Sequence, residues 1–104
     1  MGPIRTMNGM QLEFSGEIFE WRGPAPHHFV AVPEPESSAL AEISAGVTYG
    51  WGMIPVTGVV GRTSFATSLW PREGGYVVPL KVALRRAEGL EVGDVITVRL
   101  TVGA

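Results

Sequence analysis

Hydrophobic and polar residues alternate along residues 10–21, "MQLEFSGEIFEW". Leu12, Phe14 and Ile18 fall on one face of this stretch, and the positions between them are mostly polar. Because successive side chains of a β-strand point to opposite faces, the pattern predicts a half-buried strand.

The end of this stretch departs from the alternation. Phe19 and Trp21 fall on the otherwise polar face. Either the strand bends near Gly16, or both of its faces are covered at that end.

Further β-type runs follow along the chain. Alternation over residues 54–60 predicts a second long strand, and Gly61-Arg62 then suits a two-residue hairpin turn before "TSFATSLW". "PREGG" reads as another turn. The remaining strands are predicted at the short runs "FVAV" and "YVV" and at the C-terminal run in which Ile96, Val98, Leu100 and Val102 point inward.

Two segments favour helices. "PEPESSALAEISAG" has Glu34 and Glu36 where a helix N-terminus favours negative charge, and Gly46 is a plausible stop. For the second helix, residues 80–88, Pro79 would open the first turn. A stripe of apolar residues then predicts its buried face: Leu80, Leu84 and Ala87.

The stretch "GLEVGDVITVRL" joins the second helix to the last strand. Gly89 would end the helix and Leu90 would pack back against it. "EVGD" would turn the chain, with Asp94 hydrogen-bonding nearby backbone.

Together these elements predict a mainly β protein with two short helices, folded as a small, closed or nearly closed barrel. The chain of 104 residues contains 14 glycines and 8 prolines, which agrees with many short strands and turns. We expect one barrel domain over residues 10–104, preceded by a loose lead-in at residues 1–9.

Composition narrows the chemistry. There is no cysteine, which excludes disulfides, cysteine-ligated zinc and a thiol nucleophile. The net charge of −2 counts against binding to nucleic acid. Without an apolar run long enough to span a membrane, and without a recognisable signal peptide, we expect a cytoplasmic protein.

The usual catalytic and metal motifs do not stand out. His27 and His28 are adjacent, so in an extended segment their side chains point in opposite directions, and no third ligand lies at a recognisable spacing. The serines and threonines of "RTSFATSLW" lack a nucleophile elbow, and "GWGMIP" lacks the third glycine of a phosphate loop. The sequence therefore predicts no metal and no cofactor.

The best remaining candidate site combines aromatic and basic residues. Such a group could hold a small anionic or planar ligand, or a peptide. The alternative is that the aromatic residues plug the barrel ends and the basic residues only solvate the surface. The candidate ligand-binding residues are Trp51, Trp70, Arg72, Tyr76, Lys81 and Arg85.

Several linked motifs resemble the bacterial family called domain of unknown function 1905. They are the FVxVP run, GWGxxPV, the TSL strand, the PLKxAxRRAEGL helix and the VGDxVxV strand, and the resemblance covers residues 10–102. One departure is His28, where the family often has a large aromatic residue. The resemblance implies a double-split β-barrel, a fold shared with swapped-hairpin transcription factors and antitoxin DNA-binding domains, and it implies no established activity.

Three functions remain open. The first is a non-catalytic module that binds a small molecule or a peptide, as a monomer or weak dimer. The second is a DNA-binding regulator, argued from the shared fold alone. The third is a small enzyme that uses His27 or His28 with arginine or tyrosine partners.

Overall fold

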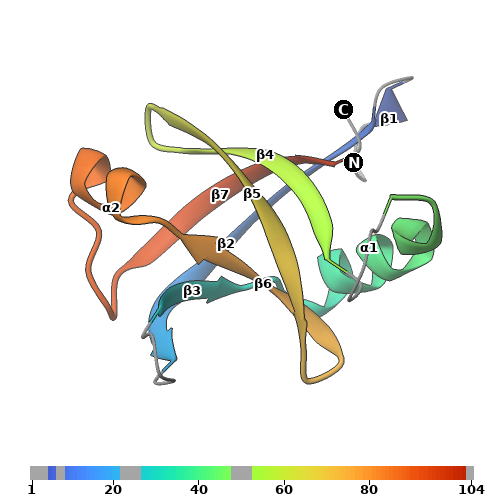
Figure 1. The fold of residues 1–104 in the computed structure, drawn as a ribbon, viewed down its shortest axis with the longest axis horizontal. Helices are drawn as coiled ribbons and strands as arrows, with labels where there is room; N and C mark the ends of the chain where they lie inside the picture. The colour runs from blue at the N-terminus through green and yellow to red at the C-terminus, as the bar shows by residue number, and fades with distance from the viewer. Residues whose placement is uncertain (1–4, 7–8, 22–26, 48–52, 103–104) are drawn as a thin grey trace.

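A computed structural model describes residues 5–6, 9–21, 27–47 and 53–102 of the chain, and within it six strands close into an antiparallel barrel (Figure 1). Around the barrel the order is β2 (Gly9–Trp21), β3 (His27–Ala31), β6 (Gly75–Leu80), β5 (Thr63–Arg72), β4 (Ile54–Val60) and β7 (Val95–Val102), and β7 pairs back with β2. The helices are α1 (Glu34–Val47) and α2 (Val82–Glu88). This confirms the predicted mainly β barrel with two helices.

A short strand β1 (Arg5–Thr6) lies outside the barrel and pairs with the start of β2. The boundary expected between a lead-in at residues 1–9 and a domain at residues 10–104 stays a prediction.

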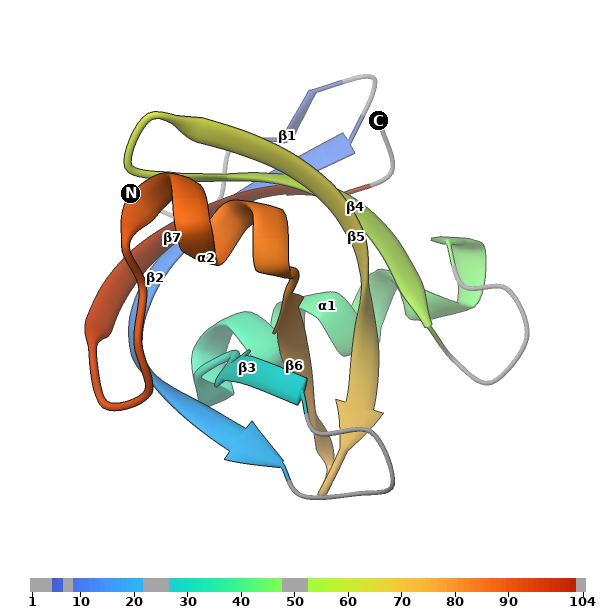
Figure 2. The ribbon, with the colours of Figure 1, turned by 60° about the vertical axis from the view of Figure 1, so that its left-hand side comes forward.

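Two long strands each divide between two sheets, as Figure 2 shows from the curvature of β2 and β5. In sheet A, β2 pairs with β7 as far as Glu17, and β5 pairs with β4 as far as Leu69. In sheet B, β2 continues from Ile18 along β3, and β5 continues from Trp70 along β6. The change of partner in β2 comes after Glu17, one residue beyond Gly16, near which the sequence suggests a bend.

Gly16 allows the two sheets to meet closely. A Cβ atom at this position would lie 2.8 Å from Cγ1 of Val30 on β3. A larger residue would therefore push β3 away from the point where β2 turns into sheet B.

Three prolines lie inside strands, each where the strand has only one hydrogen-bonded neighbour. Pro55 precedes the part of β4 that pairs with β7, Pro71 follows the part of β5 that pairs with β4, and Pro79 follows the part of β6 that pairs with β5. Proline lacks an N–H donor, so it is tolerated at a position where one side of the strand forms no hydrogen bonds with a neighbouring strand.

The barrel is filled by the inward side chains of its strands. β7 alternates as predicted, with its four inward residues buried and Thr97 and Arg99 exposed. The apolar residues that fill the barrel and its ends include Leu12, Phe14, Ile18, Val30, Leu40, Ile54, Val56, Leu69, Val78, Leu80, Leu84, Val98 and Leu100.

The hairpin between β5 and β6 is tighter than the sequence predicts. The interpretation of "PREGG" as a turn is wrong at its ends, because Pro71 and Arg72 belong to β5 and Gly75 begins β6. Only Glu73 and Gly74 turn the chain, with φ of +50° and +81°. Two positive φ values in a two-residue loop are typical of a type I′ hairpin turn.

The second helix starts later than predicted. Pro79 and Leu80 are the last residues of β6, Lys81 is the N-cap, and Ala87 is exposed rather than buried. Leu84 alone provides its buried contact. The predicted stop is confirmed: Gly89 has φ of +64°, and the N–H of Leu90 donates to the carbonyl of Arg85 at 2.9 Å.

The acidic turn after α2 is pinned to β2. The carboxylate of Asp94 accepts a hydrogen bond from the N–H of Glu91 at 2.9 Å, as predicted. The N–H of Gly93 donates to the carbonyl of Ile18, and the N–H of Ile18 donates to the carbonyl of Asp94, each at 2.8 Å. The "EVGD" turn therefore fastens β2 where that strand changes sheets.

The first helix begins as predicted, with Glu34 and Glu36 in its first turn, but it continues past Gly46 to Val47. Leu40 is fully buried and joins the barrel core. Contacts with β6 and β4 hold α1 against the barrel.

Candidate functional site

The outer face of sheet B carries a cluster of aromatic rings, which we call the outer aromatic cluster: Phe19, His27, Phe29 and Trp70. Val30 faces the barrel core, so its neighbour Phe29 points away from it, and yet Phe29 is only 1% exposed. Its ring centroid lies 5.9 Å from that of Phe19, 6.0 Å from that of His27 and 5.2 Å from that of Trp70. The sheet thus has an apolar outer face as well as an apolar inner one.

Strand register explains how these rings meet. Phe19 on β2 lies directly opposite Phe29 on the neighbouring strand β3. Trp70 on β5 lies opposite Val77 on β6, the strand that separates β5 from β3. The rings of His27 and Trp70 meet edge to face at 5.8 Å and 72°. Of these contacts, Phe19–Phe29 is a directly opposed cross-strand pair, which stabilises a sheet by about 0.2–1 kcal/mol.

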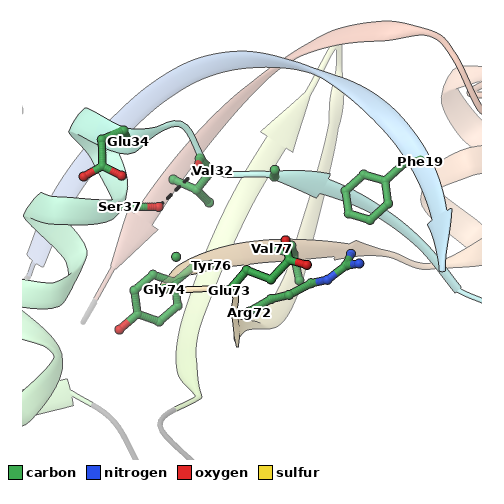
Figure 3. Close-up of a pocket in the computed structure, with 11 residues that line it drawn as sticks. Phe19, Val32, Glu34, Ser37, Arg72, Glu73, Gly74, Tyr76 and Val77 are labelled. Atoms are coloured by element: carbon green, nitrogen blue, oxygen red, sulfur yellow. Dashed lines mark hydrogen bonds between the residues drawn. The ribbon is translucent and has the colours of Figure 1, made fainter.

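A pocket with a volume of about 360 Å³ lies beside this cluster (Figure 3). Its floor is the outer face of sheet B, where Phe19, Ala31 and Val77 line it. One wall is the segment that leads from Val32 into the first turn of α1, and the opposite wall is the β5–β6 hairpin over residues 72–76.

The wall at α1 is held by hydrogen bonds. Ser37 is 4% exposed; its hydroxyl donates to the carbonyl of Val32 at 3.0 Å, and its N–H donates to the carbonyl of Pro33 at 2.8 Å. The N–H of Val32 donates to the carbonyl of Tyr76 at 2.9 Å, which joins this wall to the hairpin. Gly75 lets the hairpin come close to Ser37, because a Cβ atom at this position would lie 3.3 Å from Oγ of Ser37.

Arg72 is the cation of the pocket. Its Cζ atom lies 5.1 Å from the ring centroid of Phe19, within the range of a cation–π interaction. Figure 3 shows the guanidinium reaching along the hairpin toward Phe19, with Glu34 at the opposite side of the view. Among the described residues Arg72 forms no ion pair, so its N–H groups remain available to a ligand.

The structure separates the residues that the sequence proposed as one site. Arg72 and Tyr76 line the pocket, and Trp70 lies next to it in the outer aromatic cluster. Lys81 and Arg85 do not line it: Nζ of Lys81 donates to the carbonyl of Ala66 at 3.3 Å, and Nε of Arg85 donates to the carbonyl of Leu80 at 3.2 Å. Trp51 lies outside the described residues.

Several lining residues were not identified from the sequence as parts of a site. Phe19 gave one signal, because it is a large apolar side chain on the polar face of a predicted strand. Ser37, Glu34 and Glu73 gave none, since helix starts and hairpin turns ordinarily carry such residues.

The two histidines point to opposite sides of β3. His27 is exposed and packs against Trp70, whereas His28 is half-buried, and its Nδ1 atom is buried without a hydrogen-bond partner among the described residues. No group of His, Asp or Glu side chains in the described part of the chain could hold a metal ion. The described lining of the pocket contains no histidine that could serve Ser37 as a base.

Neither of the two helices, over the residues that the structure describes, is long and apolar enough to cross a membrane. A search of curated proteins returned no match to the chain. The model of one protein family, described as "Domain of unknown function (DUF1905)", matches residues 14–100. The matched segment includes β3, β4, β5 and β6 in full, most of β2 and β7, both helices and the described lining of the pocket, and the chain therefore belongs to the DUF1905 family.

Proposed function

We propose that this protein is a non-catalytic module that binds a small molecule in the pocket between α1 and the β5–β6 hairpin. The observation that carries the proposal is the pocket itself: about 360 Å³ of space with an apolar floor and one guanidinium that forms no ion pair with the residues the structure describes. Binding pockets combine apolar walls with a few polar groups in this way, and their volumes are typically about 300–1,000 Å³. The volume here suits a ligand at the small end of that range.

The walls favour a preformed site. Hydrogen bonds from Ser37 and Val32 hold the entry to α1, and the tight hairpin turn places Arg72 and Tyr76 on adjacent strands. A site with little freedom to reorganise loses less conformational entropy when a ligand binds.

The test is to fill the pocket from its floor. Ala31 is exposed and lines the pocket from β3, so Ala31→Tyr introduces a ring into the space at a position where a strand tolerates it. Ala66→Tyr is the matched control, because Ala66 is an exposed strand residue that does not line the pocket.

Binding is measured with four probes that share a phenyl ring: 3-phenylpropanol, 3-phenylpropionate, 2-phenylethylamine and phenylalanine. We expect at least one of them to shift the backbone amide NMR signals of Ser37, Tyr76 and Val77, and Ala31→Tyr, but not Ala66→Tyr, to abolish the shifts. The proposal fails if no probe shifts these signals at millimolar concentration, or if the Ala31→Tyr protein responds as the parent does.

A further inference from the structure

Two charged side chains of the pocket, Arg72 and Glu34, lie toward different ends of it. At one end, the Cζ atom of Arg72 lies over the ring of Phe19. The planar fork of an arginine matches the two oxygens of a carboxylate. This end of the pocket therefore suits a carboxylate.

The other end carries a carboxylate of its own. Glu34 begins α1, and its Oε1 atom accepts a hydrogen bond from the hydroxyl of Ser38 at 3.0 Å. Its second oxygen accepts none from the described residues, and Figure 3 shows the side chain on the far side of the pocket from Arg72. A primary ammonium group has three donors for such an oxygen.

The sum of the charges argues against a simple anion. One guanidinium, from Arg72, faces two carboxylates, from Glu34 and Glu73, so the lining carries a net charge of −1. An anion bound at Arg72 would be repelled by the two carboxylates, and a simple cation would leave the guanidinium without a partner. A ligand that carries both charges satisfies both ends.

Apolar side chains lie between these two ends. In Figure 3, Val32 and Val77 lie between Glu34 and Arg72, with Glu73 next to Val77 and the ring of Tyr76 on the side of Glu34. A hydrocarbon or aromatic group that joins the two charges of a ligand would be buried there.

We infer that the ligand is a small zwitterion of the amino-acid type, which places its carboxylate at Arg72, its ammonium group at Glu34 and its side chain on the apolar floor. The inference rests on the proposed function, since it names the ligand class of the same pocket.

The four phenyl probes test it, because they share a phenylethyl group and differ in whether they also carry a carboxylate, an ammonium group, both or neither. Phenylalanine has both charges, 3-phenylpropionate only the negative one, 2-phenylethylamine only the positive one, and 3-phenylpropanol neither. Dissociation constants from NMR titration are compared for the parent protein and for Arg72→Gln and Glu34→Gln. Arg99→Gln on β7 and Glu42→Gln on α1 are the matched controls, because both residues are exposed and neither lines the pocket.

We expect phenylalanine to bind most tightly, by about three- to ten-fold over either singly charged probe, as for partly exposed charge-assisted contacts. In Arg72→Gln, phenylalanine should bind no more tightly than 2-phenylethylamine. In Glu34→Gln, phenylalanine should bind no more tightly than 3-phenylpropionate. The dissociation constants of both control variants should equal those of the parent. Unchanged amide spectra in the absence of probe show that the variants remain folded.

Two results would separate the failure of this inference from that of the proposed function. If 3-phenylpropanol or a singly charged probe binds the pocket as tightly as phenylalanine, the zwitterion is wrong and the binding module stands. If none of the four probes binds, the proposed function itself fails.

Discussion

Gly93 shows at the scale of one residue how a turn depends on glycine. Its φ is +95°, and nothing lies within 4 Å of where a Cβ would stand, so the restriction comes from the backbone rather than from crowding. We predict that Gly93→Val destabilises the protein by about 1–3 kcal/mol, measured by urea denaturation. Gly93→Asn should recover part of the loss, because asparagine tolerates positive φ. Equal stability of the Val variant and the parent would contradict this account of the turn.

Glu73 is the one described residue other than glycine with a positive φ, +50°. Asn-Gly is the favoured pair for a type I′ turn, and here the pair is Glu-Gly. We predict that Glu73→Asn raises the free energy of unfolding by about 0.4–1 kcal/mol because it relieves the backbone strain. Glu73→Gln is the control for charge, since it removes the carboxylate and keeps the strain. A gain from Glu73→Gln equal to that from Glu73→Asn would assign the effect to charge instead.

At the scale of the element, β7 offers a direct test of strand alternation. Val98 is 0% exposed and Val95 is 71% exposed on the same strand. We predict that Val98→Asp unfolds the domain, because a carboxylate there would be buried without a partner, and that Val95→Asp leaves it folded. Far-UV circular dichroism and thermal melting distinguish the two variants. A folded Val98→Asp protein would show that β7 does not face the core as described.

Strands with strict alternation were predictable from the sequence, whereas the ends of β5 and β6 that contain Pro71 and Pro79 were not. β7 and β4 follow the period of two and were correctly identified. Pro71 and Pro79 were interpreted as a turn and a helix start, because proline commonly marks both. Their strand positions depend on which neighbours β5 and β6 have at those points, and no local pattern carries that information.

The candidate site was predictable only in part, for a similar reason. Arg72 and Tyr76 are close in sequence and lie on one hairpin, so the sequence could group them. Phe19 and Ser37 reach the same pocket only because β2 crosses into sheet B and α1 starts beside the hairpin. That proximity is a property of the closed barrel.

At the scale of the whole molecule, the barrel core and the outer aromatic cluster share the same strands. Phe29 points outward and its neighbour Val30 points into the core, so loss of either packing disrupts β3. We predict one cooperative unfolding transition. In a chain with Trp21→Phe and Trp51→Phe, the fluorescence of Trp70 reports the cluster, and its midpoint in urea should coincide with that of far-UV circular dichroism. An earlier midpoint for Trp70 would show that the outer face of sheet B melts separately.

The pairing of Met10 with Val102 on the β2–β7 ladder has a practical consequence. Opposed residues of antiparallel strands have Cα atoms about 4.5–5.5 Å apart, so the polypeptide enters and leaves the barrel at nearly one point. Residues 10–102 could therefore be inserted into a surface loop of a host protein, such as a fluorescent reporter, without forcing the two ends of that loop apart. The pocket lies on the other half of β2, beyond Gly16, and would stay open to solvent. With the binding that we propose for this pocket, such an insert would be a ligand-responsive sensor cassette.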